Sequence, residues 1–302
     1  MRLRDILEEG KNLLTKNKIE DAEHDATEIL LNILDMDMAR FLLECEDDLE
    51  KKYGTSSISN LISDFDELIN ARANHYPLQY ILGETYFMGL RFNVDRDVLI
   101  PRSDTETLVE KVMSDNQDKN ISILDMCTGS GCIAITLSAV GNYKLIVGTD
   151  ISDAALEIAA KNADELIEDN DVVDEMNKHI YFLKSDMFKN LSKLNDKLGL
   201  STFDIITANP PYIKTGDIKN LQEEIKDYEP LIALDGDKDG LKYYKEIANE
   251  AKNYLNKMGK IYLEIGYNQA KDVREIFENK GYTHIETVKD LGGKDRVIIF
   301  TI

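Results

Sequence analysis

The run Asn209-Pro210-Pro211-Tyr212 ends an apolar segment that starts at Phe203 and has the composition of a buried strand. Proline has no N–H and its ring fixes φ, so the turn is stiff and the carbonyl of Pro210 keeps one direction. The side chain of Asn209 adds a second carbonyl acceptor. Two acceptors that converge on one planar NH2 group would orient it, and the ring of Tyr212 can stack on an amide or a base. The run indicates a recognition site for an amino group.

Such a site suits methyl transfer to nitrogen. An amide or aniline-type nitrogen is a poor nucleophile, because its lone pair is delocalised into the neighbouring π system. Hydrogen bonds from its two protons to Asn209 and Pro210 would direct the lone pair toward a methyl group and favour a pyramidal nitrogen. No general base is required before the attack, since the nitrogen loses its proton easily once it is methylated. A loop that merely ends a strand explains the prolines, but not the Asn and Tyr around them.

A glycine loop lies upstream, between a predicted strand at residues 121–126 and a predicted helix. Small residues at such a place let a ligand approach the backbone and the helix N-terminus. No Gly-Lys-Ser/Thr follows, so this is not a Walker loop, and the match to the dinucleotide fingerprint is only the permissive G-x-G-x-x-A form. On the loop alone, a dinucleotide oxidoreductase or a purely structural turn remains an alternative. The expected binding residues are Asp125, Cys127, Thr128, Gly129, Ser130 and Gly131.

The next predicted strand, residues 144–150, ends at an acid. Asp150 lies about 20 residues after Gly131, the spacing of a ribose-binding carboxylate. Ser152 is better placed to cap the helix that follows, which would leave the Asp150 carboxylate free for ribose hydroxyls. The sequence therefore predicts that Asp150 binds a ribose.

A third predicted strand, residues 180–186, ends at Asp186, which can accept from an adenine amino group or simply cap a turn. Met187 or Phe188 would then lie beside the adenine ring. A ligand with adenine and ribose, held without phosphate-binding lysines, fits S-adenosylmethionine better than ATP or NAD. Its sulfonium is a cation, and Asp125 can help to receive its methionine end, directly or through water.

The elements that would position these residues form two regions and a connector. Residues 1–75 show only helical periodicity and predict a small helical domain. Alternation around Met88 and Gly89 predicts a β-hairpin within a connector, residues 76–100. In residues 101–302, short apolar runs alternate with amphipathic helices, which indicates an α/β fold with a Rossmann-like, mostly parallel sheet. The last twenty residues look like an antiparallel hairpin at the C-terminal end of this sheet.

Composition narrows the function classes. The 302 residues are 43% hydrophobic and 31% charged, as in ordinary globular proteins. The net charge of −21 opposes binding to phosphate backbones, so a nucleic-acid partner is disfavoured. Three scattered cysteines suggest a reducing compartment. We expect a cytoplasmic protein without a membrane partner, because the N-terminus carries early charges and no apolar stretch approaches ~20 residues.

No metal site is predicted, because the histidines lack the spacing of metal ligands. The four histidines are His24, His75, His179 and His284.

In the residues of the glycine loop and the Asn-Pro-Pro-Tyr run, the chain resembles the release factor glutamine methyltransferases. These are class I methyltransferases that modify the glutamine side-chain amide in the Gly-Gly-Gln motif of peptide chain release factors. The likeness covers nearly the whole chain. Beyond the two motifs above, it includes residues 77–83, 100–106, 227–230, 234–236, 264–266 and 295–296. Asn-Pro-Pro-Tyr alone is shared with adenine-N6 DNA methyltransferases, so a nucleic-acid adenine methyltransferase is the main alternative.

The resemblance implies a class I methyltransferase fold, S-adenosylmethionine as cofactor and a release factor as partner. It places the cofactor loop on residues 127–131, with Cys127 where glycine is common, and the ribose acid on Asp150. Met187 takes an adenine-side position that is often aromatic, and residues 209–212 form the substrate clamp, with Asn209 also beside the cofactor. It further implies that the helical domain helps to dock the protein substrate and that residues 215–240 form a lid or docking loop. We expect a monomer.

Overall fold

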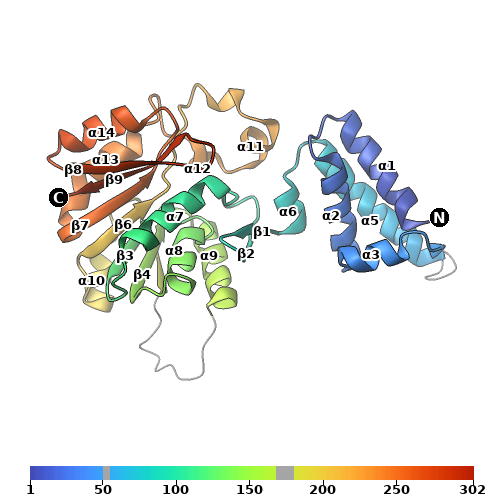
Figure 1. Cartoon of the computed structure of the whole chain (residues 1–302), viewed down its shortest axis with the longest axis horizontal. Coiled ribbons are helices and arrows are strands. Elements are labelled where there is room, and N and C mark those ends of the chain that lie inside the picture. The colour runs from blue at the N-terminus through green and yellow to red at the C-terminus, as the bar shows by residue number, and fades with distance from the viewer. Residues whose placement is uncertain (50–54, 168–179) are drawn as a thin grey trace, which may run out of the picture. The chain divides into compact units, whose positions relative to one another are not determined.

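The computed structural model describes residues 1–49, 55–167 and 180–302 (Figure 1). The chain divides into two compact units. Unit 1 consists of Met1–Glu84 and Gln222–Tyr228, and unit 2 of Thr85–Leu221 and Glu229–Ile302. Among these residues, unit 1 has one hydrophobic core and unit 2 has two.

Unit 1 is helical. Its helices bury one face each, because apolar residues recur every three or four positions, and side chains such as Leu14, Ile29 and Phe65 form the core. Gly10 of the first helix lies so close to Phe65 that a Cβ there would be 2.6 Å from its ring. The helices from the N-terminal part of the chain are α1 (Leu3–Lys16), α2 (Ala22–Leu34), α3 (Met38–Glu44), α5 (Thr55–Ala73) and α6 (Leu78–Leu82).

A helix from much later in the chain, α11 (Glu223–Tyr228), also belongs to unit 1. Its Glu224 accepts a hydrogen bond from the buried guanidinium of Arg72 at 2.6 Å. Arg72 also donates to Asp25, itself buried, at 2.7 Å. One buried cation thus joins α2, α5 and α11.

Unit 2 contains a seven-stranded sheet in the order β5-β4-β3-β6-β7-β9-β8. The first five strands in this order are parallel, and β9 pairs antiparallel with both β7 and β8. The predicted parallel sheet and terminal hairpin are therefore confirmed. The strands are β3 (Ser122–Met126), β4 (Leu145–Asp150), β5 (Ile180–Lys184), β6 (Phe203–Ala208), β7 (Leu255–Glu264), β8 (Thr283–Lys289) and β9 (Asp295–Thr301).

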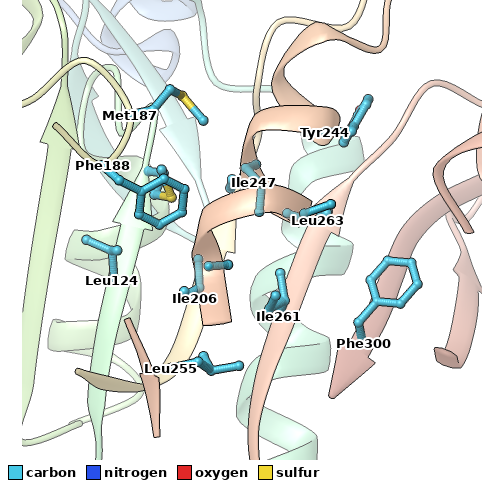
Figure 2. Close-up of a cluster of buried hydrophobic side chains, with 14 of the residues drawn as sticks. Leu124, Met187, Phe188, Ile206, Tyr244, Ile247, Leu255, Ile261, Leu263 and Phe300 are labelled. Atoms are coloured by element: carbon cyan, nitrogen blue, oxygen red, sulfur yellow. The ribbon is translucent and has the colours of Figure 1, made fainter. Parts of the chain in front are cut away.

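Helices cover both faces of this sheet, which is why its strands read as continuous apolar runs. In β7, Ile261 and Leu263 point to one core and Tyr262 to the other. Figure 2 shows the first core, where Ile247 lies over Ile206 and Ile261. One layer contains α7 (Ser103–Asp115), α8 (Cys132–Ala139) and α9 (Asp153–Leu166), and the other α10 (Ser192–Leu198), α13 (Lys242–Glu250) and α14 (Ala270–Glu278).

The predicted hairpin is present as β1 (Glu84–Phe87) and β2 (Leu90–Asn93). Its turn residues, Met88 and Gly89, both have positive φ, as a type I′ turn requires. The structure adds what periodicity missed. Helix α6 precedes the hairpin, and residues 215–240, expected as a long loop, contain η1 (Ile218–Asn220), α11 and α12 (Leu231–Leu234). These helices are too short for a 3.6-residue pattern to repeat.

Candidate active site

A pocket of unit 2 lies at the carboxyl ends of the parallel strands. The chain proceeds from β3 to β4 and β5 on one side and returns to β6 on the other, so the pocket lies where the strand order reverses. Open α/β sheets bind ligands at such a point. The pocket measures about 1000 Å³ with its solvent-open mouth, large enough for a nucleoside-sized ligand. Its walls include residues from 97–105, 126–133, 149–155, 185–187, 209–211 and 230–233, together with Tyr243.

Two glycines of the loop have different roles. Gly129 lines the pocket at φ +53°, and a Cβ built on it would meet nothing within 4 Å, so the space above it is open to a ligand. Gly131 does not line the pocket, and a Cβ there would be 2.8 Å from the side chain of Ile135 and 3.2 Å from Ala159. Gly131 thus permits close packing between α8 and α9, and its expected role in binding a ligand stays a prediction.

Asp125 lies behind the loop and not at the pocket surface. Its side chain is fully buried and accepts hydrogen bonds from Thr128 Oγ1 at 2.6 Å and Thr207 Oγ1 at 2.8 Å. Burial raises the pKa of Asp125 to about 7. Asp125 thus holds the glycine loop against β6, and its contact with the methionine end of a cofactor, directly or through water, stays a prediction.

Asp150 ends β4 and lines the pocket. The structure confirms that Ser152 caps α9, since its hydroxyl accepts from Ala155 N at 3.2 Å. The expectation that the Asp150 carboxylate is otherwise free is wrong. Its Oδ2 accepts from Gly129 N at 2.9 Å and its Oδ1 from Ser152 N at 3.0 Å. Each oxygen keeps a second lone pair, and burial raises the pKa of Asp150 above its ordinary value.

Asp186 and Met187 both line the pocket, whereas Phe188 is fully buried and stacks on Tyr254. Figure 2 shows Met187 beside Phe188 at the edge of the core. Met187 has φ +48°, and its carbonyl accepts from Ser185 Oγ at 2.7 Å, which fixes this turn. Asp186 forms an ion pair with Lys189. Of the two side chains expected beside an adenine ring, the pocket therefore presents Met187.

The pocket wall is acidic. Among the described residues that line it, Asp97, Asp150 and Asp186 carry carboxylates, and Arg102 is the one basic residue. Arg102 forms an ion pair with the buried Glu229. Such a wall suits a cationic ligand such as a sulfonium and lacks the lysines that would hold a pyrophosphate. Together with the open space over Gly129, the donors and acceptors present fit S-adenosylmethionine.

Asn209 and Pro211 line the pocket where β6 ends. Asn209 Nδ2 donates to Thr105 Oγ1 at 3.3 Å. Within the described residues, neither Asn209 Oδ1 nor the carbonyl of Pro210 receives a hydrogen bond. Both carbonyl oxygens are therefore without a hydrogen bond within the described residues, as an NH2-binding site requires, and Asn209 lines the pocket itself.

Tyr212 is placed differently from the stacking expectation. It does not line the pocket, and its ring packs against the core. Its hydroxyl donates to Glu264 Oε1 at 3.3 Å, and its carbonyl accepts from Gln269 Nε2 at 3.0 Å. Pro210 is buried and likewise does not line the pocket.

Two residues beside the clamp were not assigned roles from the sequence. Thr105 lines the pocket, and its hydroxyl donates to Glu264 Oε2 at 2.6 Å. Glu264 is buried at the end of β7, next to β6, and burial raises its pKa to about 7. The sequence did contain a signal for Glu264, because an acid at the carboxyl end of an apolar strand is a candidate site residue.

Across the three described stretches, no group of three or more His, Cys, Asp or Glu side chains could hold a metal ion. His179 lies outside the described residues. Over the same stretches, no helix is both long and apolar enough to cross a membrane.

Comparison with known proteins shows relatives along the whole chain. A protein named release factor glutamine methyltransferase from Thermodesulfovibrio yellowstonii is 40% identical over 94% of this chain and 94% of its own length. One of the same name from Clostridium botulinum is 37% identical over 99% of this chain and 98% of its own. The family model described as PrmC N-terminal domain matches residues 5–83.

A second family model, described as ribosomal protein L11 methyltransferase (PrmA), matches residues 104–228, which is less than half of the chain. Among solved structures, a protein described as a SAM-dependent methyltransferase from Streptococcus mutans matches with a TM-score of 0.50 and 12% identity. The match covers 83% of this chain and 67% of that chain. At this identity the likeness concerns the fold, a class I methyltransferase sheet with a parallel core.

Proposed function

Because the chain belongs to the release factor glutamine methyltransferase family, we propose that Asn209 and Pro210 hold the side-chain amide of a release-factor glutamine for methylation. The enzyme transfers a methyl group from S-adenosylmethionine to the N5 nitrogen of the glutamine in the Gly-Gly-Gln motif, which tunes translation termination. The observation that carries the residue assignment is the pair of acceptors at the clamp. Asn209 is anchored through Nδ2, while its Oδ1 and the carbonyl of Pro210 receive no bond within the described residues.

We assign the cofactor to the acidic pocket. Gly129 leaves room for it, Asp150 offers acceptor lone pairs to ribose hydroxyls, and Asp186 and Met187 form the adenine side. When bound, S-adenosylmethionine supplies an electrophilic methyl group on a positively charged sulfur. Cys127, Thr128 and Ser130 complete the loop that encloses it.

The clamp residues act on the substrate nitrogen. Asn209 Oδ1 and the Pro210 carbonyl accept one hydrogen bond each from the glutamine NH2, which turns the nitrogen lone pair away from its own carbonyl. Both hydrogen bonds strengthen as positive charge develops on the nitrogen, so they stabilise the transition state more than the bound amide. Pro211 keeps the turn stiff. The surplus proton passes to water, because the methylated amide is a strong acid.

The N-terminal unit supplies docking for the protein substrate in this proposal. Residues 5–83 match the PrmC N-terminal domain model, and the large apolar side chains that α3 exposes include Leu42 at 65% and Leu43 at 83%. A substrate from the translation apparatus places the reaction in the cytoplasm. The names of the full-length relatives and the net charge of −21 favour this substrate over the adenine of a nucleic acid.

The test is transfer of labelled methyl groups from S-adenosylmethionine. Purified release factor, its Gly-Gly-Ala variant and duplex DNA are offered to the wild type and to Asn209→Ala. Label should appear only in the Gln-containing protein and should be lost in Asn209→Ala. Label on DNA would overturn the substrate assignment, and full activity of Asn209→Ala would overturn the clamp.

A further inference from the structure

We propose that Thr105 and Glu264 are positioning residues that fix which end of the Asn209 carboxamide faces the substrate. The inference rests on the proposed function, because it concerns the acceptor that holds the glutamine NH2. A carboxamide has an acceptor oxygen at one end and an NH2 donor at the other, and the two ends have nearly the same shape. Only the oxygen end can accept a hydrogen bond from the substrate NH2.

The three side chains form a chain of hydrogen bonds with a defined direction. Thr105 Oγ1 uses its one O–H to donate a hydrogen bond to Glu264 Oε2 at 2.6 Å. Its oxygen can then only accept, and Asn209 Nδ2 lies 3.3 Å away as the donor. A reversed Asn209 amide would place its oxygen against a hydroxyl whose proton is already engaged. The ionised Glu264 therefore imposes the orientation in which Asn209 Oδ1 points away from Thr105.

This orientation decides whether the clamp works. A substrate amide offers the clamp two N–H donors. If Asn209 presented its own NH2, two donors would face each other, and the substrate nitrogen would lose one of the two bonds that direct its lone pair. A substrate held in this way reacts slowly even though the pocket is unchanged.

The second oxygen of Glu264 serves the other end of the clamp. Tyr212, the last residue of the run, donates its hydroxyl to Glu264 Oε1 at 3.3 Å. One carboxylate thus holds the first residue of the run through Thr105 and the last directly. Pro210 and Pro211 lie between these two fixed points.

The surroundings of Glu264 determine its charge. Burial raises its pKa to about 7, and Arg296, held by Asp290 at 3.0 Å and Asp104 at 2.8 Å, opposes this shift. When Glu264 is protonated, it can donate a hydrogen bond to Thr105. The Thr105 hydroxyl can then donate to Asn209, so the hydrogen bonds no longer have a single direction. The titratable and charged groups that act on it are Asp104, Cys132, Tyr212, Tyr244 and Arg296.

The test replaces the hydroxyl in the middle of the chain. Thr105→Val keeps the shape of the side chain and removes both bonds, whereas Thr105→Ser keeps the hydroxyl. Thr136→Val is the matched control, because Thr136 is a fully buried helical threonine whose hydroxyl has no partner among the described residues. We expect kcat on intact release factor to fall at least about tenfold in Thr105→Val, with Thr105→Ser and Thr136→Val close to the wild type. The dissociation constant for S-adenosylhomocysteine should change less than about twofold in all three.

The pH profile separates positioning from stability. In the wild type and Thr105→Ser, kcat should fall as the pH drops through about 7, where Glu264 takes up a proton. This acid limb should be absent from Thr105→Val and from Glu264→Gln, which provides a second route if the valine variant does not fold.

Three outcomes would overturn the inference: Thr105→Val as fast as Thr136→Val, Thr105→Ser as slow as Thr105→Val, or an acid limb that persists in Glu264→Gln. Failure of the proposed function looks different. The wild type itself would then leave the release factor unlabelled, and both proposals would fall.

Discussion

The main-chain N–H of Gly129 donates to Oδ2 of Asp150 at 2.9 Å, so the glycine loop after β3 is tied to the end of β4. The same carboxylate offers its remaining lone pairs to the pocket. One side chain therefore shapes the loop and, in the proposed function, presents an acceptor to a ribose.

Asp150→Asn should weaken cofactor binding by at least about tenfold. An amide has one acceptor oxygen, so it cannot accept from both Gly129 N and Ser152 N, and its NH2 would face an N–H donor. Calorimetric titration with S-adenosylhomocysteine measures the change. Asp153→Asn is the control, because Asp153 is exposed and pairs with Lys184 outside the pocket lining. Equal affinities of the two variants would contradict the role of Asp150.

Alanine at Gly129 should chiefly affect cofactor binding, whereas alanine at Gly131 should chiefly affect stability. Gly129→Ala enters open space at the pocket and should chiefly weaken cofactor binding, with a cost of about 1–2 kcal/mol in unfolding free energy for a left-handed residue. Gly131→Ala has the same backbone cost, and its methyl group also meets Ile135 and Ala159, which adds about 1–3 kcal/mol. Urea unfolding and cofactor titration of both variants check this. The assignment fails if Gly131→Ala is the more stable of the two.

Asp125 should make the protein less stable as the pH rises. Its folded pKa is raised to about 7, so its contribution to the unfolding free energy is fully present below its unfolded pKa of about 3.8 and is lost as the pH rises through about 7. Asp125→Asn cannot ionise, so its stability should fall less between pH 5 and pH 8. Chemical unfolding at several pH values provides the comparison. Parallel curves for the two proteins would show that Asp125 is ionised without cost.

Arg72→Met should destabilise unit 1 by about 3–5 kcal/mol, because it leaves Asp25 buried without its cation. Arg274→Met is the control: its pair with Glu278 is exposed and contributes less than about 1 kcal/mol. Thermal unfolding of both variants measures the difference. Similar melting temperatures would mean that Asp25 finds other compensation.

The exposed apolar residues of α3 should affect binding of the protein substrate and not binding of the cofactor. Leu42→Asp with Leu43→Asp should raise KM for intact release factor and leave cofactor binding unchanged, because both side chains are exposed in unit 1. Met258→Asp, an equally exposed position in unit 2, serves as the control. An unchanged KM in the double variant would place the docking surface elsewhere.

The sheet could be predicted from the sequence, and the run from Asn209 to Tyr212 could be recognised as a candidate site, because their signals are local. Strands covered on both faces read as apolar runs such as Phe203–Ala208, and two prolines with Asn and Tyr form a compact motif. Because these strands are parallel, Asn209 and Asp150 both lie at the carboxyl ends of the strands.

Side-chain direction could not be predicted in the same way. Asp125 and Asp150 are both acids at the ends of apolar strands, yet one is turned inward to two threonines and the other lines the pocket. The partnership of Thr105 with Glu264 joins residues 159 positions apart, and only the fold brings them together. No periodicity within either segment contains that information.

The placement of α11 determines when unit 1 can be completed during synthesis of the chain. Unit 1 is assembled from Met1–Glu84 and Gln222–Tyr228, so most of unit 2 is synthesised before the last piece of unit 1 leaves the ribosome. Until then Arg72 can pair with Asp25 but not with Glu224, so the hydrogen bonds inside unit 1 are incomplete. For the same reason, a graft of this unit onto another protein would have to carry both pieces of the chain, because a cut after Glu84 leaves α11 behind.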